Sequence, residues 1–91
     1  MKKRDRLEII HDILLTIRDR QGKVKPTTIL YKSNLSYQML NEYLGELLEK
    51  EFITEHIDKS EKKSYELNDK GYQYIADYKM VRQFIDSYGL E

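Results

Sequence analysis

Apolar residues recur every three or four positions in two long stretches of the chain, the spacing of an amphipathic helix. The first stretch covers residues 5–20 and stops at a glycine, Gly22, which can take the left-handed conformation at a helix end. The second covers residues 37–51 and follows Ser36, whose hydroxyl can cap the first turn of a helix. The pattern therefore predicts two helices that each bury one face.

Shorter elements lie between and after these helices. Val24 stands alone between two lysines, which suits a very short extended segment, and Pro26 suits the first turn of a brief helix over residues 27–32. Residues 52–57 and 64–67 have strand patterns separated by a polar turn, so they predict a hairpin. A last helix is expected over residues 69–88, with Asn68 as its cap.

The order of predicted elements is helix, short strand, helix, helix, hairpin, helix. This order predicts an α+β fold, mostly α, in the winged helix-turn-helix arrangement, with residues 33–35 at the turn between the second and third helices and the hairpin as the wing. We assign residues 1–67 to the winged helix-turn-helix domain. Residues 68–91 form a C-terminal helix that packs on the core at its start, through Tyr72 and Ile75, and dimerises beyond it.

The apolar residues of the last helix step by four, three, four and three, which is the heptad seam of two helices packed together. The predicted dimer interface consists of Tyr74, Tyr78, Val81, Ile85 and Tyr88. A second copy of the chain is the simplest cover for such a seam. The alternative is that the helix folds back on its own domain.

Three stretches of sequence carry a resemblance. KRDRLEII at residues 3–10, YKSNLSY at residues 31–37 and YELNDKG at residues 65–71 resemble signature stretches of the small archaeal winged-helix proteins, which include chromatin-associated dimers. The resemblance implies binding to double-stranded DNA and dimerisation through the last helix.

Charge is balanced overall but unevenly distributed. The chain has 16 basic and 16 acidic side chains. Residues 1–33 hold nine basic and four acidic side chains, whereas residues 34–58 hold one basic and six acidic ones. Any phosphate-binding surface must therefore come from the N-terminal third and from the lysines of the predicted wing.

The predicted DNA contacts form two groups. Those expected at phosphates are basic: Lys3, Arg4, Lys32, Lys59, Lys62 and Lys63. Those expected nearest the bases lie at the start of the third helix: Ser36, Tyr37, Gln38 and Asn41. Amide side chains there suit adenine edges.

An alternative function uses the remainder of the third helix. A helical wheel places Glu42, Glu46 and Glu49 on its outer face, with Met39 beside them. These carboxylates would repel phosphates, and they would suit a basic protein partner of an adaptor module.

Catalytic and metal chemistry is not expected. The chain has no cysteine, and its two histidines, His11 and His56, lack the spacing of metal ligands. We therefore expect no enzyme activity, no cofactor and no metal. No apolar run reaches membrane-spanning length, so a cytoplasmic, nucleoid-associated protein is expected.

Overall fold

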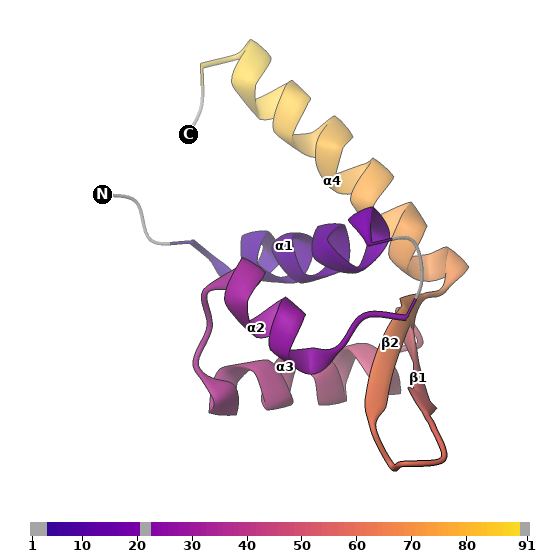
Figure 1. The fold of residues 1–91 in the computed structure, drawn as a ribbon. Helices are drawn as coiled ribbons and strands as arrows, with labels where there is room; N and C mark the ends of the chain where they lie inside the picture. The colour runs from indigo at the N-terminus through magenta and orange to yellow at the C-terminus, as the bar shows by residue number, and fades with distance from the viewer. Residues whose placement is uncertain (1–3, 21–22, 90–91) are drawn as a thin grey trace.

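The computed structural model describes residues 4–20 and 23–89 (Figure 1). These residues form α1 (Arg6–Asp19), α2 (Pro26–Ser33), α3 (Tyr37–Glu49), β1 (Ile53–Ile57), β2 (Lys63–Leu67) and α4 (Asp69–Ser87). The predicted order is confirmed, and each element begins and ends within two residues of its predicted bounds. The winged helix-turn-helix fold class is confirmed with it.

One core holds these elements together, with α1 at its centre. α1 contributes five buried residues, and Ile13 and Leu14 among them are fully enclosed. The remaining core side chains come from the other elements and from the segment before α2: Val24, Ile29, Leu40, Leu44, Leu47, Ile53, Tyr65, Leu67 and Ile75. Burial of these apolar side chains is the main force that fixes α2, α3 and the hairpin against α1.

Polar caps define the helix ends. The carboxylate of Asp5 accepts a hydrogen bond from the Glu8 amide at 2.8 Å, and the Ser36 hydroxyl accepts one from the Met39 amide at 3.1 Å. The predicted Ser36 cap is thus confirmed. Asn34, at φ 53°, ends α2 in the left-handed conformation that asparagine tolerates.

The prediction that the Asn68 side chain caps the last helix is wrong. Asn68 occupies the N-cap position of α4, but its side chain makes no capping bond. The side-chain oxygen of Asn68 accepts a hydrogen bond from the Thr54 hydroxyl, and its side-chain NH2 group donates one to the Glu51 backbone carbonyl at 3.1 Å. The side chain therefore fastens the start of α4 to the start of the hairpin.

The hairpin is antiparallel, and its register pairs Ile53 with Leu67 and Ile57 with Lys63. Val24 forms an isolated bridge with Tyr65, with backbone bonds of 2.9 and 2.8 Å. This bridge confirms the short extended segment expected at Val24. The bridge also holds the segment before α2 against β2 of the wing.

The buried residues of α4, Gly71 and Ile75, lie in its first two turns. Ile75 is buried as expected, whereas Tyr72, also expected at the core, is 52% exposed because it lies on the outer side of the helix. The C-terminal end of α4 extends away from the other elements, and the longest dimension of the molecule is 50 Å (Figure 1). Over the described ranges, no helix has an apolar stretch long enough to cross a membrane.

Candidate nucleic-acid interface

Arg4 links α1 to the end of α2. Its guanidinium donates to the Asp12 carboxylate of α1 and to the Ser33 carbonyl at the end of α2, both at 2.6 Å. A longer bond of 3.3 Å reaches the Asn34 carbonyl. Arg4, expected to contact phosphate, is therefore engaged inside the molecule, and Lys3 lies outside the described residues.

The residues expected nearest the bases lie together on the first turns of α3. Tyr37 is 59% exposed, and Ser36, Gln38 and Asn41 are exposed with it. Ser36 uses its hydroxyl to cap the helix, and the Gln38 amide lies 3.4 Å from a carboxylate oxygen of Glu42. The first turns of α3 thus present two amide side chains and one phenol to solvent.

Glu46 does not belong to the outer face of α3, and its predicted outward position is wrong. Its carboxylate is turned toward α1, where it accepts from Arg6, and it also accepts from Lys50 at 2.9 Å. The hydrogen bond from Lys50, and to a smaller extent the one from Arg6, hold the pKa of Glu46 below its ordinary value. The acidic outer surface of α3 is therefore smaller than the helical wheel predicts.

The tip of the wing is an ordered turn that presents lysines. One oxygen of Asp58 accepts the Ser60 amide at 2.8 Å and the Lys62 amide at 3.0 Å. Glu61 takes a positive φ of 62° inside this turn. Three exposed lysines surround it: Lys59, Lys62 and Lys63. The backbone of the tip is thus fixed, while its charged groups remain in water.

Acidic residues are missing from one stretch of the sequence. Residues 20–41 contain no aspartate or glutamate, although the chain has 16 of them. The stretch carries four basic side chains: Arg20, Lys23, Lys25 and Lys32. It covers α2, the turn and the first turns of α3. The sequence contains this signal, but a charge count divided at residue 33 hides it.

Two residues of the predicted dimer seam contact α1 of the same chain. The Tyr74 hydroxyl donates to the Leu7 carbonyl at 2.8 Å, and the Tyr78 ring stacks on His11 with ring centroids 4.2 Å apart. Burial raises the pKa of Tyr74 to about 12 and lowers the pKa of His11. These rings therefore join α4 to its own domain.

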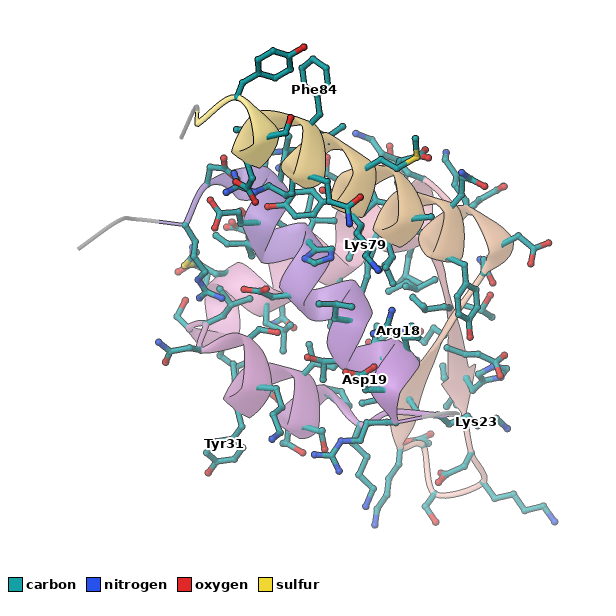
Figure 2. The ribbon with its side chains drawn as sticks, turned by 90° about the horizontal axis from the view of Figure 1, so that it is seen from above. Arg18, Asp19, Lys23, Tyr31, Lys79 and Phe84 are labelled. Atoms are coloured by element: carbon teal, nitrogen blue, oxygen red, sulfur yellow. The ribbon has the colours of Figure 1, made fainter. Side chains whose placement is uncertain are left out.

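The remainder of the seam has an exposed apolar surface. Val81 is 54% exposed and Tyr88 67%, whereas Ile85 is half-buried. Phe84, which the heptad pattern omits, is 63% exposed and projects outward from α4 (Figure 2). Next to this surface, Leu7 of α1 and residues of α4 line an apolar groove. We call Val81, Phe84 and Tyr88 the free face of α4.

Known proteins resemble the chain in sequence and in structure. It is 39% identical over 51 residues to the uncharacterized protein MJ0290 of Methanocaldococcus jannaschii, a match that covers 56% of this chain and 23% of that relative. The chain therefore spans about a quarter of that protein.

Two solved structures are similar in fold. Sso10a-2, a DNA-binding protein from Sulfolobus solfataricus, superposes with a TM-score of 0.77 at 24% identity, over 94% of this chain and 90% of its own. MepR, a transcription regulator of the Staphylococcus aureus multidrug efflux pump MepA, gives a TM-score of 0.74 at 15% identity, over 89% of this chain and 60% of its own. A MepR–DNA complex is also similar, with a TM-score of 0.69.

A sequence model of winged helix-turn-helix proteins matches residues 3–86, which include every helix and strand up to the last turn of α4. The match covers both helices of the helix-turn-helix and the wing. The chain belongs to the winged helix-turn-helix family.

Proposed function

We propose that the protein binds duplex DNA as a homodimer, acting in the nucleoid as a transcriptional regulator or a chromatin-associated protein. The observation that carries the proposal is the acid-free segment that includes α2 and the start of α3, together with a wing tip that exposes three lysines. Contacts between cationic side chains and phosphates dominate the affinity of proteins for DNA. Such a surface suits a polyanion.

In this proposal the N-terminal end of α3 enters the major groove. The amides of Gln38 and Asn41 suit adenine edges, and the Glu42 carboxylate suits the amino group of cytosine. The first turns of α3 carry no arginine for guanine. Lys32 and the wing lysines contact phosphates and set the position of the helix.

The alternative, an adaptor with an acidic α3, has less support. Glu46 already has two cationic partners within the chain, Arg6 and Lys50. Glu42 and Glu49 remain exposed, but they lie beyond the first turn of α3. We therefore favour DNA over a basic protein as the partner.

The free face of α4 supports the homodimer. Val81, Phe84 and Tyr88 expose three large apolar side chains on the part of the helix that extends past the domain. Contiguous apolar surface of this kind marks an interaction site in small proteins. Pairing two copies through this face would cover it in both. We include Phe84 and Leu7 in the proposed interface with Val81, Ile85 and Tyr88.

Charge reversal in the wing tests the proposal. Lys62→Glu and Lys63→Glu should each weaken binding to every duplex sequence alike, and each should reduce the slope of log affinity against log salt by about 1. Lys79→Glu, an exposed lysine of α4, is the matched control and should leave the slope unchanged. Fluorescence anisotropy measures both quantities. Equal slopes for the wing variants and the wild type would remove the wing from the interface.

A further inference from the structure

Tyr31 is an aromatic residue that lies outside the hydrophobic core. Its side chain is 84% exposed, the highest exposure among the large apolar side chains of residues 4–20 and 23–89. It lies near the end of α2, and its neighbours Ile29 and Leu30 supply the packing contacts of that helix. Figure 2 shows Tyr31 projecting from α2 into solvent.

The segment of sequence around Tyr31 exposes polar and basic side chains and contains no acidic residue. Thr27, one helical turn earlier, and Lys32, next in sequence, are both exposed, and Lys25 is exposed at the N-cap of the same helix. No acidic residue occurs between Asp19 and Glu42. A phenol in such surroundings suits an anionic partner, because its hydroxyl can donate a hydrogen bond where lysines supply the charge.

We propose that Tyr31 is a DNA-backbone contact in which its hydroxyl donates to a phosphate oxygen and its ring lies against the neighbouring deoxyribose. The inference rests on the proposed function. The first helix of a helix-turn-helix crosses the backbone of the duplex, so the outward side of α2 faces phosphates and sugars. Tyr31 then acts beside Lys32 and fixes the position of α2 on the duplex.

A neutral contact has a distinct signature. Lysines that neutralise phosphates release counterions, so their loss reduces the salt dependence of binding. A phenol releases no counterion, so its loss should reduce affinity at every salt concentration by the same factor. The slope of log affinity against log salt therefore separates the contribution of Tyr31 from that of Lys32.

The experiment is anisotropy titration of a mixed-sequence duplex at several salt concentrations, with Tyr31→Phe, Tyr31→Ala and Lys32→Ala. We expect Tyr31→Phe to bind about 3-fold more weakly and Tyr31→Ala about 10-fold more weakly, in line with the loss of one hydrogen bond and then the ring, with wild-type slopes. Lys32→Ala should reduce the slope by about 1. The control is Tyr72→Ala, an exposed tyrosine on α4, which should bind like the wild type.

Three results would overturn the inference: Tyr31→Ala with wild-type affinity, Tyr31→Phe with wild-type affinity, or a Tyr31 variant with a reduced slope. The first is also the result expected if Tyr31 serves a protein partner instead. Circular dichroism of each variant checks the fold. Failure of the proposed function is distinguishable, because the wild type itself would then bind no duplex at any salt concentration.

Discussion

Arg4 and Glu46 show how single residues acquire a role only when their neighbours are known. Each has a charge whose sign suggests a surface function, phosphate binding for Arg4 and an acidic binding face for Glu46. In the structure Arg4 joins Asp12 to the end of α2, and Glu46 joins Arg6 to Lys50. Both charges are used to fix α1 against the helix-turn-helix.

Removal of Arg4 should therefore lower the free energy of unfolding and leave the salt dependence of DNA affinity unchanged. Arg4→Ala leaves the Ser33 carbonyl and the Asp12 carboxylate without this donor, so we expect a loss of about 1–2 kcal/mol in the free energy of unfolding. Arg4→Lys should recover part of it, since a lysine has a single donor nitrogen, whereas Arg4 bonds Asp12 and Ser33 through two different nitrogens. Urea unfolding measures the loss, with Arg20→Ala, an exposed arginine at the end of α1, as the control.

Salt-dependent DNA binding separates the two roles of Arg4. If Arg4 is a brace, Arg4→Ala should keep the wild-type slope of log affinity against log salt. A slope reduced by about 1, with unchanged stability, would return Arg4 to the set of phosphate contacts.

At the scale of elements, the sequence was sufficient to predict the order and bounds of the helices and strands. Stripes such as Leu40, Leu44 and Leu47 and the cap at Ser36 are local signals, and local signals can be read without knowing the fold. The packing partners of α4 are not local. The heptad spacing assigns Tyr74 and Tyr78 to a dimer, but their contacts with Leu7 and His11 depend on the direction in which α4 leaves the hairpin.

Alanine substitutions at two glycines test how closely the elements pack. A Cβ at Gly71 would lie 2.5 Å from the Phe52 carbonyl oxygen, so Gly71→Ala should push α4 from the hairpin and cost about 1–3 kcal/mol. A Cβ at Gly45 of α3 would meet nothing within 4 Å. Gly45→Ala should therefore stabilise the protein by about 0.5–1 kcal/mol.

Thermal unfolding at one protein concentration compares these glycine variants. We expect the midpoint to fall for Gly71→Ala and to rise for Gly45→Ala, by about 4–8 °C per kcal/mol in a domain of this size. Equal midpoints for Gly71→Ala and the wild type would contradict the close approach of α4 to Phe52.

We predict that the free face of α4 forms the dimer interface. Val81→Glu combined with Phe84→Glu places two charges on this face, and we expect the protein to become monomeric by light scattering. Both side chains are more than half exposed in the single chain, so the substitutions should spare the fold. The matched control is Ala76→Glu with Gln83→Glu, two exposed residues on the opposite side of α4. A dimeric free-face variant would exclude this face as the interface.

At the scale of the whole molecule, zero net charge conceals an uneven distribution of charge along the chain. Residues 20–41 contain no acidic side chain, the wing tip exposes three lysines, and acidic side chains such as Asp12 and Glu46 are paired within the chain. Net charge alone would therefore argue against DNA binding, whereas the arrangement of charge favours it. Composition could not have predicted this, because it does not record where along the chain the charges lie.

The most direct test of DNA binding is anisotropy of a labelled mixed-sequence duplex titrated with the wild-type protein at several salt concentrations. Lys32 and the three wing lysines predict a log affinity that falls linearly with log salt, with a slope of about −3 to −4 for each protomer. A folded protein that binds no duplex even at the lowest salt concentration would contradict the DNA-binding function, and the exposed Glu42 and Glu49 of α3 would then become the surface to test against a basic partner.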